Sequence, residues 1–175
     1  MREIPFHKPC IQDDELSEVA DTLRNGWLTM GPKTIEFEEA FRQQVGARYA
    51  VSMNSCTAAL HIALKVIGLQ KNDEVIIPTI TFAATAEVVR YFDAHPVLVD
   101  VDPETHNIIP ADIERHITKK TRAIIPVHFG GQPADMDAIN ELAAACNLKV
   151  IEDAAHCFPS CYKGKPVGGL SDITA

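Results

Sequence analysis

The sequence lacks any apolar run that approaches the roughly 18 residues of a membrane-spanning helix. It also lacks a basic excess, because 16 Lys and Arg stand against 24 Asp and Glu, a net charge of −8. That balance argues against a surface for nucleic acid or for an anionic membrane. The first residues have none of the apolar character of a secretory signal peptide. We therefore expect a cytoplasmic protein that binds neither nucleic acid nor a membrane.

Signatures of metal and nucleotide sites are missing as well. The five cysteines form no CxxC pair, and no spaced pair of histidines accompanies them. We therefore predict reduced thiols and no metal site. Neither a GxGxxG nor a GxxxxGK pattern is present, so a nicotinamide-type or P-loop site has little support. The sequence does have 46% hydrophobic residues over 175 positions, enough for a real core.

Short apolar runs alternate with helical patterns along most of the chain. Strands are predicted at 49–53, 74–77, 97–99, 123–127 and 148–151. Helices are predicted between them at 57–67, 83–92, 110–117 and 135–146. This alternation implies crossover units and an α/β fold with three layers, in which helices cover both faces of a mostly parallel sheet.

Two further helices are predicted before the alternating region. One spans 13–25, and Gly26 suits its C-terminal end. The other runs from Pro32 to Val45, and its expected buried stripe consists of Phe37, Ala40, Phe41 and Val45. At the other end of the sequence, 168–175 resembles the start of another strand, so we expect the sequence to be the first part of a longer protein.

Polar and aromatic side chains follow the predicted strands. They lie in the segments 54–57, 78–82 and 128–132, at Asp100 and Asp102, and at Asp153 and His156. In a parallel sheet the carboxyl ends of all strands lie at one edge, where ligands bind in open α/β sheets. Their convergence on that edge predicts a site there.

Each of these residues has a functional and a structural interpretation. The segment 55–57 opens a helix, which suits a phosphate group, or Ser55 is an ordinary helix cap. Phe82 stacks on a planar ring or belongs to the core. Asp153 accepts a hydrogen bond from a protonated ring nitrogen or caps a helix, and His156 contacts the same ring or a local carbonyl. Taken together, the functional interpretations describe a pyridoxal phosphate pocket.

The chain resembles the DegT/StrS-type nucleotide-sugar aminotransferases, which are pyridoxal-phosphate enzymes of fold type I. The matching segments are 26–32, 54–60, 73–76, 78–82, 126–135 and 151–156. The resemblance implies that residues 1–32 form an arm, a helix and a substrate loop. It implies that 33–175 form the cofactor-binding large domain, incomplete at its C-terminal end. It also implies a homodimer.

The resemblance implies a role for each candidate residue. Cys56 and Thr57 hold the cofactor phosphate, and Phe82 stacks on the pyridine ring. Asp153 pairs with the ring nitrogen, and His156 lies near the phenolic oxygen. The residues expected to touch the sugar nucleotide are Phe6, Gly26, Trp27, Leu28 and Thr29.

The implied reaction moves an amino group from an amino acid, with glutamate favoured, to a keto group of a nucleotide-linked sugar for polysaccharide biosynthesis. C4 of a 4-keto-6-deoxy sugar is the favoured position. The Schiff-base lysine of this family is expected after Ala175, so we expect the present stretch alone to be inactive. Two alternatives stay open: a sugar dehydratase of the same fold, in which histidine replaces the lysine, and a non-catalytic cofactor-binding or regulatory protein.

Overall fold

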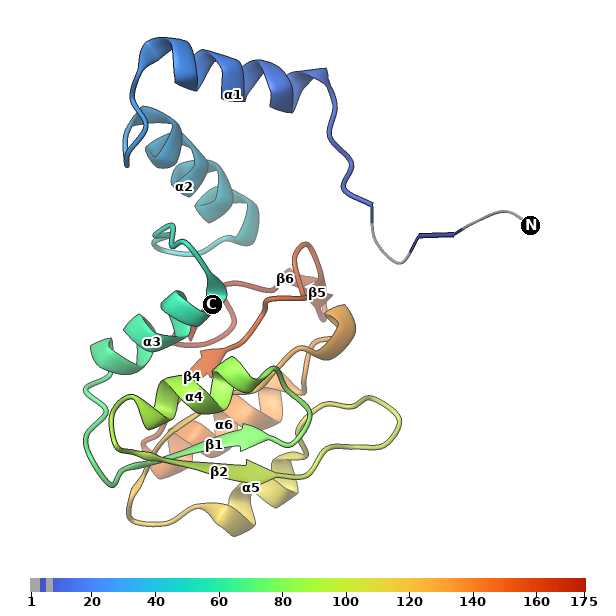
Figure 1. Cartoon of the computed structure of the whole chain (residues 1–175). Coiled ribbons are helices and arrows are strands. Elements are labelled where there is room, and N and C mark those ends of the chain that lie inside the picture. The colour runs from blue at the N-terminus through green and yellow to red at the C-terminus, as the bar shows by residue number, and fades with distance from the viewer. Residues whose placement is uncertain (1–3, 6–7) are drawn as a thin grey trace. The chain divides into compact units, whose positions relative to one another are not determined.

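The computed structural model describes residues 4–5 and 8–175. The chain divides into two compact units, residues 1–40 and 41–175, and each is described by itself. The first unit contains α1 (Asp13–Asn25) and most of α2 (Pro32–Val45). The second contains the end of α2 and a sheet with its helices (Figure 1). None of the helices in the described ranges is long and apolar enough to cross a membrane.

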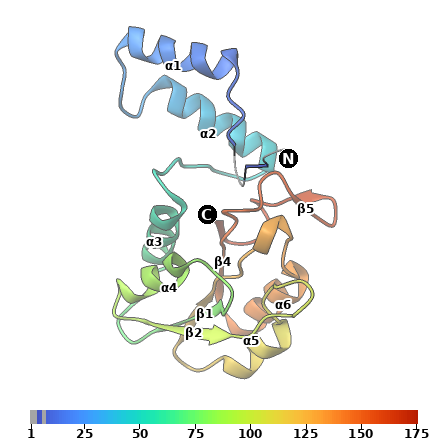
Figure 2. The same ribbon diagram turned by 45° about the vertical axis from the view of Figure 1, so that its right-hand side comes forward.

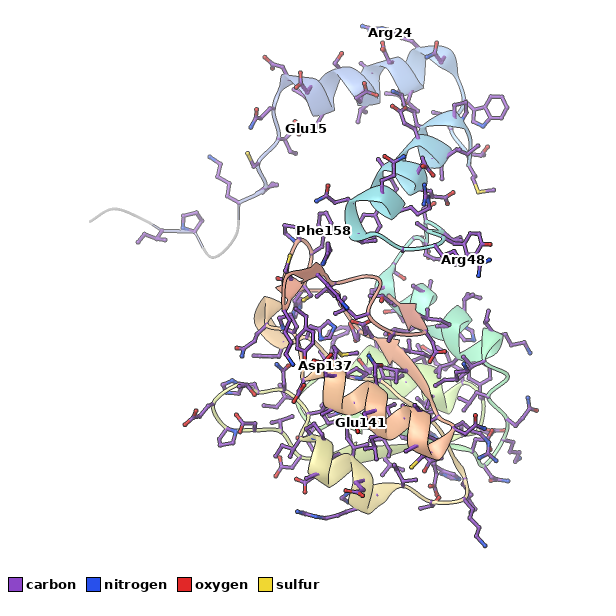
Figure 3. The ribbon with its side chains drawn as sticks, turned by 180° about the vertical axis from the view of Figure 1, so that it is seen from behind. Glu15, Arg24, Arg48, Asp137, Glu141 and Phe158 are labelled. Carbon is purple, nitrogen blue, oxygen red and sulfur yellow. The ribbon has the colours of Figure 1, made fainter. Side chains whose placement is uncertain are left out.

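Helix α1 has the bounds that the sequence predicts. At its start the Gln12 N–H donates to the Glu15 carboxylate at 2.7 Å, which satisfies a backbone donor beside the first turn. At its end Gly26 adopts a left-handed conformation with φ 72°, which terminates the helix. Figure 3 shows Glu15 and Arg24 near opposite ends of α1, the placement that the helix dipole favours.

Helix α2 also forms where predicted, but its expected buried stripe is only partly confirmed, since Phe41 is half-buried. Phe37 is 58% exposed and Ala40 is exposed, whereas Val45 at the C-terminal end is buried. An apolar stripe is buried only where another segment packs on it. Val45 meets that condition, because a Cβ atom at Gly168 would lie only 2.7 Å from the Val45 Cβ.

The predicted strand at 49–53 is also wrong. The segment has no strand conformation, and Tyr49 and Val51 are 74% and 69% exposed. A strand requires a hydrogen-bonded neighbour, and no segment of the described chain pairs with these residues. The segment is apolar enough for a strand, but no neighbouring strand supplies the hydrogen bonds that would stabilise one.

The remaining predicted elements are all present. In chain order they are α3 (Cys56–Val66), β1 (Glu74–Pro78), α4 (Ala83–Arg90), β2 (His95–Val99), α5 (Pro110–His116), β3 (Thr121–Ile124), α6 (Met136–Cys146), β4 (Lys149–Glu152) and β7 (Ile173–Thr174). Three short elements were not predicted: the 3-10 helix η1 (Phe129–Gly131) and the antiparallel pair β5 (Cys161–Tyr162) and β6 (Lys165–Pro166).

The main sheet is parallel, with the strand order β2-β1-β3-β4-β7. The chain goes from β1 to β2 on one side, then returns to place β3 on the other side of β1. The order of strands therefore reverses between β1 and β3. Such a switch point opens a crevice at the carboxyl ends of the strands, where ligands bind in this class of fold.

Helices cover both faces of the sheet, as predicted. Figures 1 and 2 show α3 and α4 on one side and α5 and α6 on the other. Alternate residues of β1 supply the two cores, because Val75 and Ile77 face α3 and α4 whereas Ile76 faces α5 and α6. All three are fully buried, so the centre of the sheet presents apolar side chains to both layers of helices.

A buried polar cluster joins the ends of three strands. His128 and Glu152 are both fully buried, and their side chains are 2.9 Å apart from Nε2 to Oε2. The Ala134 N–H donates to His128 Nδ1 at 3.1 Å, so the ring proton lies on Nε2 and is donated to Glu152. The other Glu152 oxygen accepts hydrogen bonds from Ser171 and Thr174 at 2.6 and 3.0 Å. The cluster thus ties β4 to the segment after β3 and to β7.

We expect Glu152→Ala to lower the free energy of unfolding by about 3 kcal/mol, because it leaves the buried His128 N–H without an acceptor and removes an acceptor from the half-buried hydroxyls of Ser171 and Thr174. Glu152→Gln should cost less, since its amide still fits between the same groups. The measurement is urea-induced unfolding of the full-length gene product, followed by circular dichroism.

Glu141→Ala is the matched control, because Glu141 is exposed on α6 (Figure 3) and should change stability by less than about 0.5 kcal/mol. Equal effects of Glu152→Ala and Glu141→Ala would contradict the importance of the buried cluster.

Candidate active site

Asp153 lies directly after β4, at the carboxyl edge of the sheet, and is only 6% exposed. Its backbone N–H donates to the Pro126 carbonyl at 2.9 Å, and its carbonyl accepts from the His128 N–H at 3.1 Å. These two bonds hold the Asp153 backbone against the end of β3. The carboxylate is therefore presented from a rigid part of the sheet.

The Asp153 carboxylate accepts three hydrogen bonds. Thr85 Oγ1 donates to Oδ2 at 2.8 Å, the Cys56 thiol donates to Oδ1 at 3.7 Å, and the Ala155 N–H donates to Oδ1 at 3.4 Å. All three donors are uncharged, so within the described residues the carboxylate has no cationic partner. A buried carboxylate with neutral donors is suited to pairing with a cation that a ligand brings.

The N-terminus of α3 lies beside this carboxylate. The Ser55 hydroxyl caps the helix by accepting from the Ala58 N–H at 3.1 Å, which confirms the capping interpretation of Ser55. The preceding N–H groups, those of Cys56 and Thr57, have no acceptor among the described residues. Capping and anion binding are therefore compatible here, because they use different N–H groups.

The Cys56 thiol is held in its neutral form. Burial raises its pKa to about 12, and the negative charge of the neighbouring Asp153 adds to the effect. The thiol therefore keeps its proton at neutral pH and acts as a hydrogen-bond donor rather than as a nucleophile.

Phe82 is not a core residue, because it is 78% exposed at the start of α4. This result removes the structural interpretation of Phe82 and leaves its ring available to a ligand. His156 is exposed in the turn after Asp153, and Thr57 is half-buried in the first turn of α3. The roles of these side chains toward a ligand stay predictions.

The predicted substrate loop lies in the first unit. Trp27 is 59% exposed, and its indole N–H donates to the Met30 carbonyl at 3.1 Å. A Cβ atom at Gly31 would lie 2.3 Å from the Trp27 ring, so only glycine permits this close approach. The ring borders a hollow of about 290 Å³ that Leu28 and Thr29 also line. Phe6, the other predicted substrate residue, lies outside the described residues.

The structure brings Cys56 and Asp153 together but does not bring every predicted polar residue into the same place. The His128 side chain points into the protein toward Glu152. Asp102 accepts the N–H groups of Glu104 and Thr105 and so stabilises a local turn. His156, Cys157 and Cys161 do not belong to any potential metal-binding group among the described residues.

Thr85 is the residue of the site that the sequence analysis missed. It is fully buried in α4 and bonds both to Asp153 and to the Thr81 hydroxyl, with 2.7 Å between the two threonine oxygens. The sequence pattern that could have indicated Thr85 is a pair of threonines at i and i+4 around the start of a helix, because this spacing places both hydroxyls on one helical face.

The fold is that of the pyridoxal-phosphate-dependent aminotransferases. The aminotransferase Spr1654 from Streptococcus pneumoniae, in its PLP form, superposes with a TM-score of 0.94 at 37% identity, over 99% of this chain and 48% of that one. 3-Amino-5-hydroxybenzoic acid synthase superposes with a TM-score of 0.93 at 34% identity, over 98% of this chain and 45% of that one.

The chain belongs to the DegT/DnrJ/EryC1/StrS aminotransferase family, whose sequence profile matches residues 9–175. It is 46% identical over 172 residues to the spore coat polysaccharide biosynthesis protein SpsC of Bacillus subtilis, covering 98% of this chain and 44% of SpsC. It is 49% identical over 172 residues to the protein MJ1066 of Methanocaldococcus jannaschii, covering 98% of this chain and 45% of that protein. The chain thus spans less than half the length of these relatives.

We expect alkylation to report the charge of Asp153 through Cys56. At about pH 9, iodoacetamide should modify Cys56 more slowly than the exposed Cys161, because the raised pKa keeps the Cys56 thiol protonated. Asp153→Asn removes the neighbouring negative charge, lowers the pKa of Cys56 and should accelerate its modification. Mass spectrometry of peptides from the full-length gene product measures both rates, with Cys161 as the internal control. An unchanged Cys56 rate in Asp153→Asn would contradict the contact.

Proposed function

We propose that this chain provides the cofactor cradle of a pyridoxal-phosphate-dependent aminotransferase that acts on a nucleotide-linked sugar. The observation that carries the proposal is the buried Asp153 carboxylate beside the N-terminus of α3, at the carboxyl edge of the sheet. Solved relatives of the same fold include both a PLP form and a PMP form of Spr1654. Pyridoxal phosphate is accordingly the cofactor.

The residues present fit this group chemically. Asp153 has neutral donors on both oxygens and lacks a cationic partner in the described chain, which suits a protonated ring nitrogen. The N–H groups of Cys56 and Thr57 suit a phosphate, since they add to the positive end of the α3 dipole. Phe82 offers an exposed aromatic face for the ring.

When bound, pyridoxal phosphate supplies a charged pyridine ring that accepts electrons from a neighbouring carbon. Asp153 keeps the proton on the ring nitrogen by placing a negative charge beside it. Phe82 covers one ring face and excludes water from it, and His156 donates toward the phenolic oxygen. The assignments of Asp153 and Phe82 rest on residue type and position, and that of His156 to the phenolic oxygen rests on the family resemblance.

We propose glutamate as the amino donor and a keto group of a nucleotide-linked sugar as the acceptor, with C4 of a 4-keto-6-deoxy sugar favoured. The relationship to SpsC, a polysaccharide biosynthesis protein, supports a sugar as substrate. The loop from Gly26 to Thr29 supports it too, because an indole ring and polar side chains around a hollow suit a sugar nucleotide. The homodimer and the cytoplasmic location stay predictions.

Amine transfer tests the reaction directly. The full-length gene product, incubated with glutamate and a nucleotide-linked 4-keto-6-deoxy sugar, should release 2-oxoglutarate and form the amino sugar, both identified by mass spectrometry. Loss of water from the sugar without 2-oxoglutarate would favour the dehydratase. Cofactor binding without any product from either reaction, over a panel of nucleotide-linked keto-sugars, would favour the non-catalytic alternative.

We expect Asp153→Asn to weaken the binding of pyridoxamine phosphate by about tenfold to a hundredfold, the value of one hydrogen bond to a charged group. Pyridoxamine phosphate is the suitable probe because its amine forms no covalent bond with a lysine. Calorimetric titration of the cofactor-free protein measures the Kd. Asp100→Asn is the matched control, since Asp100 follows β2 at the same edge of the sheet but bonds to Thr79. Equal losses in the two variants would contradict the role of Asp153.

A further inference from the structure

Thr85 has one hydroxyl proton and two potential partners. Its oxygen lies 2.8 Å from Asp153 Oδ2 and 2.7 Å from the Thr81 oxygen. An ionised carboxylate only accepts hydrogen bonds, so Thr85 donates its proton to Asp153. Thr81 then donates to Thr85 across the shorter contact, since its other acceptor, the Phe82 carbonyl, is 3.3 Å away. The direction of the chain of hydrogen bonds is therefore set by the charge of Asp153.

Thr85 is also shielded from water, because it is fully buried in α4, a helix that packs against α3 and the sheet. No solvent molecule can replace its hydroxyl on that side of Asp153 without a cavity. The opposite oxygen of the carboxylate is held by Cys56 and by the Ala155 N–H. Donors on both oxygens restrict rotation of the carboxylate about its side-chain bond.

We propose that Thr85 is a positioning residue that fixes the orientation of the Asp153 carboxylate toward the cofactor ring. The inference rests on the function proposed above, because it assigns Asp153 to the ring nitrogen. A charge-assisted hydrogen bond to a ring nitrogen requires the carboxylate plane to face that nitrogen, and the strength of the bond falls steeply with angle. Thr85 supplies that constraint from a helix, which is more rigid than a loop.

The same hydroxyl chain reaches the predicted stacking residue. Thr81, which donates to Thr85, precedes Phe82 directly, at the start of α4. The carboxylate for the ring nitrogen and the aromatic ring for the ring face are thus connected through two threonine hydroxyls. Asp153 follows a strand and Phe82 begins a helix, so the hydroxyl chain adds a polar link between two elements that also share one apolar core.

A double-mutant cycle tests this role. Thr85→Val has nearly the same shape as the native residue but lacks the hydroxyl, so it should weaken pyridoxamine phosphate binding by about tenfold, the loss for one weakened charge-assisted hydrogen bond. Thr85→Ser keeps the hydroxyl and should bind as the unmodified protein does. In the Asp153→Asn background Thr85→Val should have almost no further effect, since the two residues act through one contact.

The outcomes separate failure of this inference from failure of the proposed function. If Asp153→Asn weakens binding but Thr85→Val does not, Thr85 has no positioning role and the proposed function stands. If Asp153→Asn leaves the Kd unchanged, the assignment of Asp153 fails first. Thr85→Val could also weaken binding equally in the native and the Asp153→Asn backgrounds, or Thr85→Ser could weaken binding as much as Thr85→Val does. Either result would indicate a packing defect and overturn the proposal.

Discussion

Burial of both faces of a parallel sheet is the constraint on which the rest of this structure depends. The strands must be apolar on each face, as Val75, Ile76 and Ile77 are, so chemistry is confined to the residues that follow the strands. The reversal of strand order between β1 and β3 then leaves a crevice at that edge. Asp153 and the first turn of α3 lie at this edge, where polar side chains can meet a ligand.

Two adjacent carboxylates at the end of β4 illustrate how alternation along a strand separates roles. Glu152 points inward to His128 and is completely satisfied by protein donors, whereas Asp153 points to the opposite side, where Thr85 and Cys56 meet it. Glu152 stabilises the strand ends, whereas Asp153 can still accept a hydrogen bond from a ligand. Successive side chains face opposite ways, so a shift by one residue would exchange the two functions.

The sequence was sufficient to predict the layers, the parallel sheet and the place of Asp153 after a strand, because apolar periodicity and strand ends carry that information. Cys56 meets Asp153 as expected, but from the start of α3 and not from the end of a strand. The sequence was not sufficient for 49–53, where a short apolar run favoured a strand whose stability depends on a neighbour. The β5–β6 hairpin was missed for a local reason. Its turn places Lys163 at φ 48°, a conformation that the identity of a lysine does not suggest.

Thr85 could not be assigned from the sequence for a different reason. A threonine in the first turn of a helix has many possible hydrogen-bond partners. Asp153 becomes the partner of Thr85 only because α4 packs beside the end of β4. Predictions from sequence are therefore strongest for residues whose position follows from the backbone, such as Asp153, and weakest for residues defined by a side-chain contact between distant elements.

The segment from Gly168 to Thr174 is attached at both ends. Gly168 lies against Val45 at the end of α2, with no room for a side chain, and Thr174 bonds to Glu152 in the neighbouring strand. Ser171, between them, bonds to the same carboxylate. A segment fixed in this way cannot change its length, because an insertion or deletion would break one attachment or the other. Its composition can vary at the exposed positions, but its residue count is set by geometry.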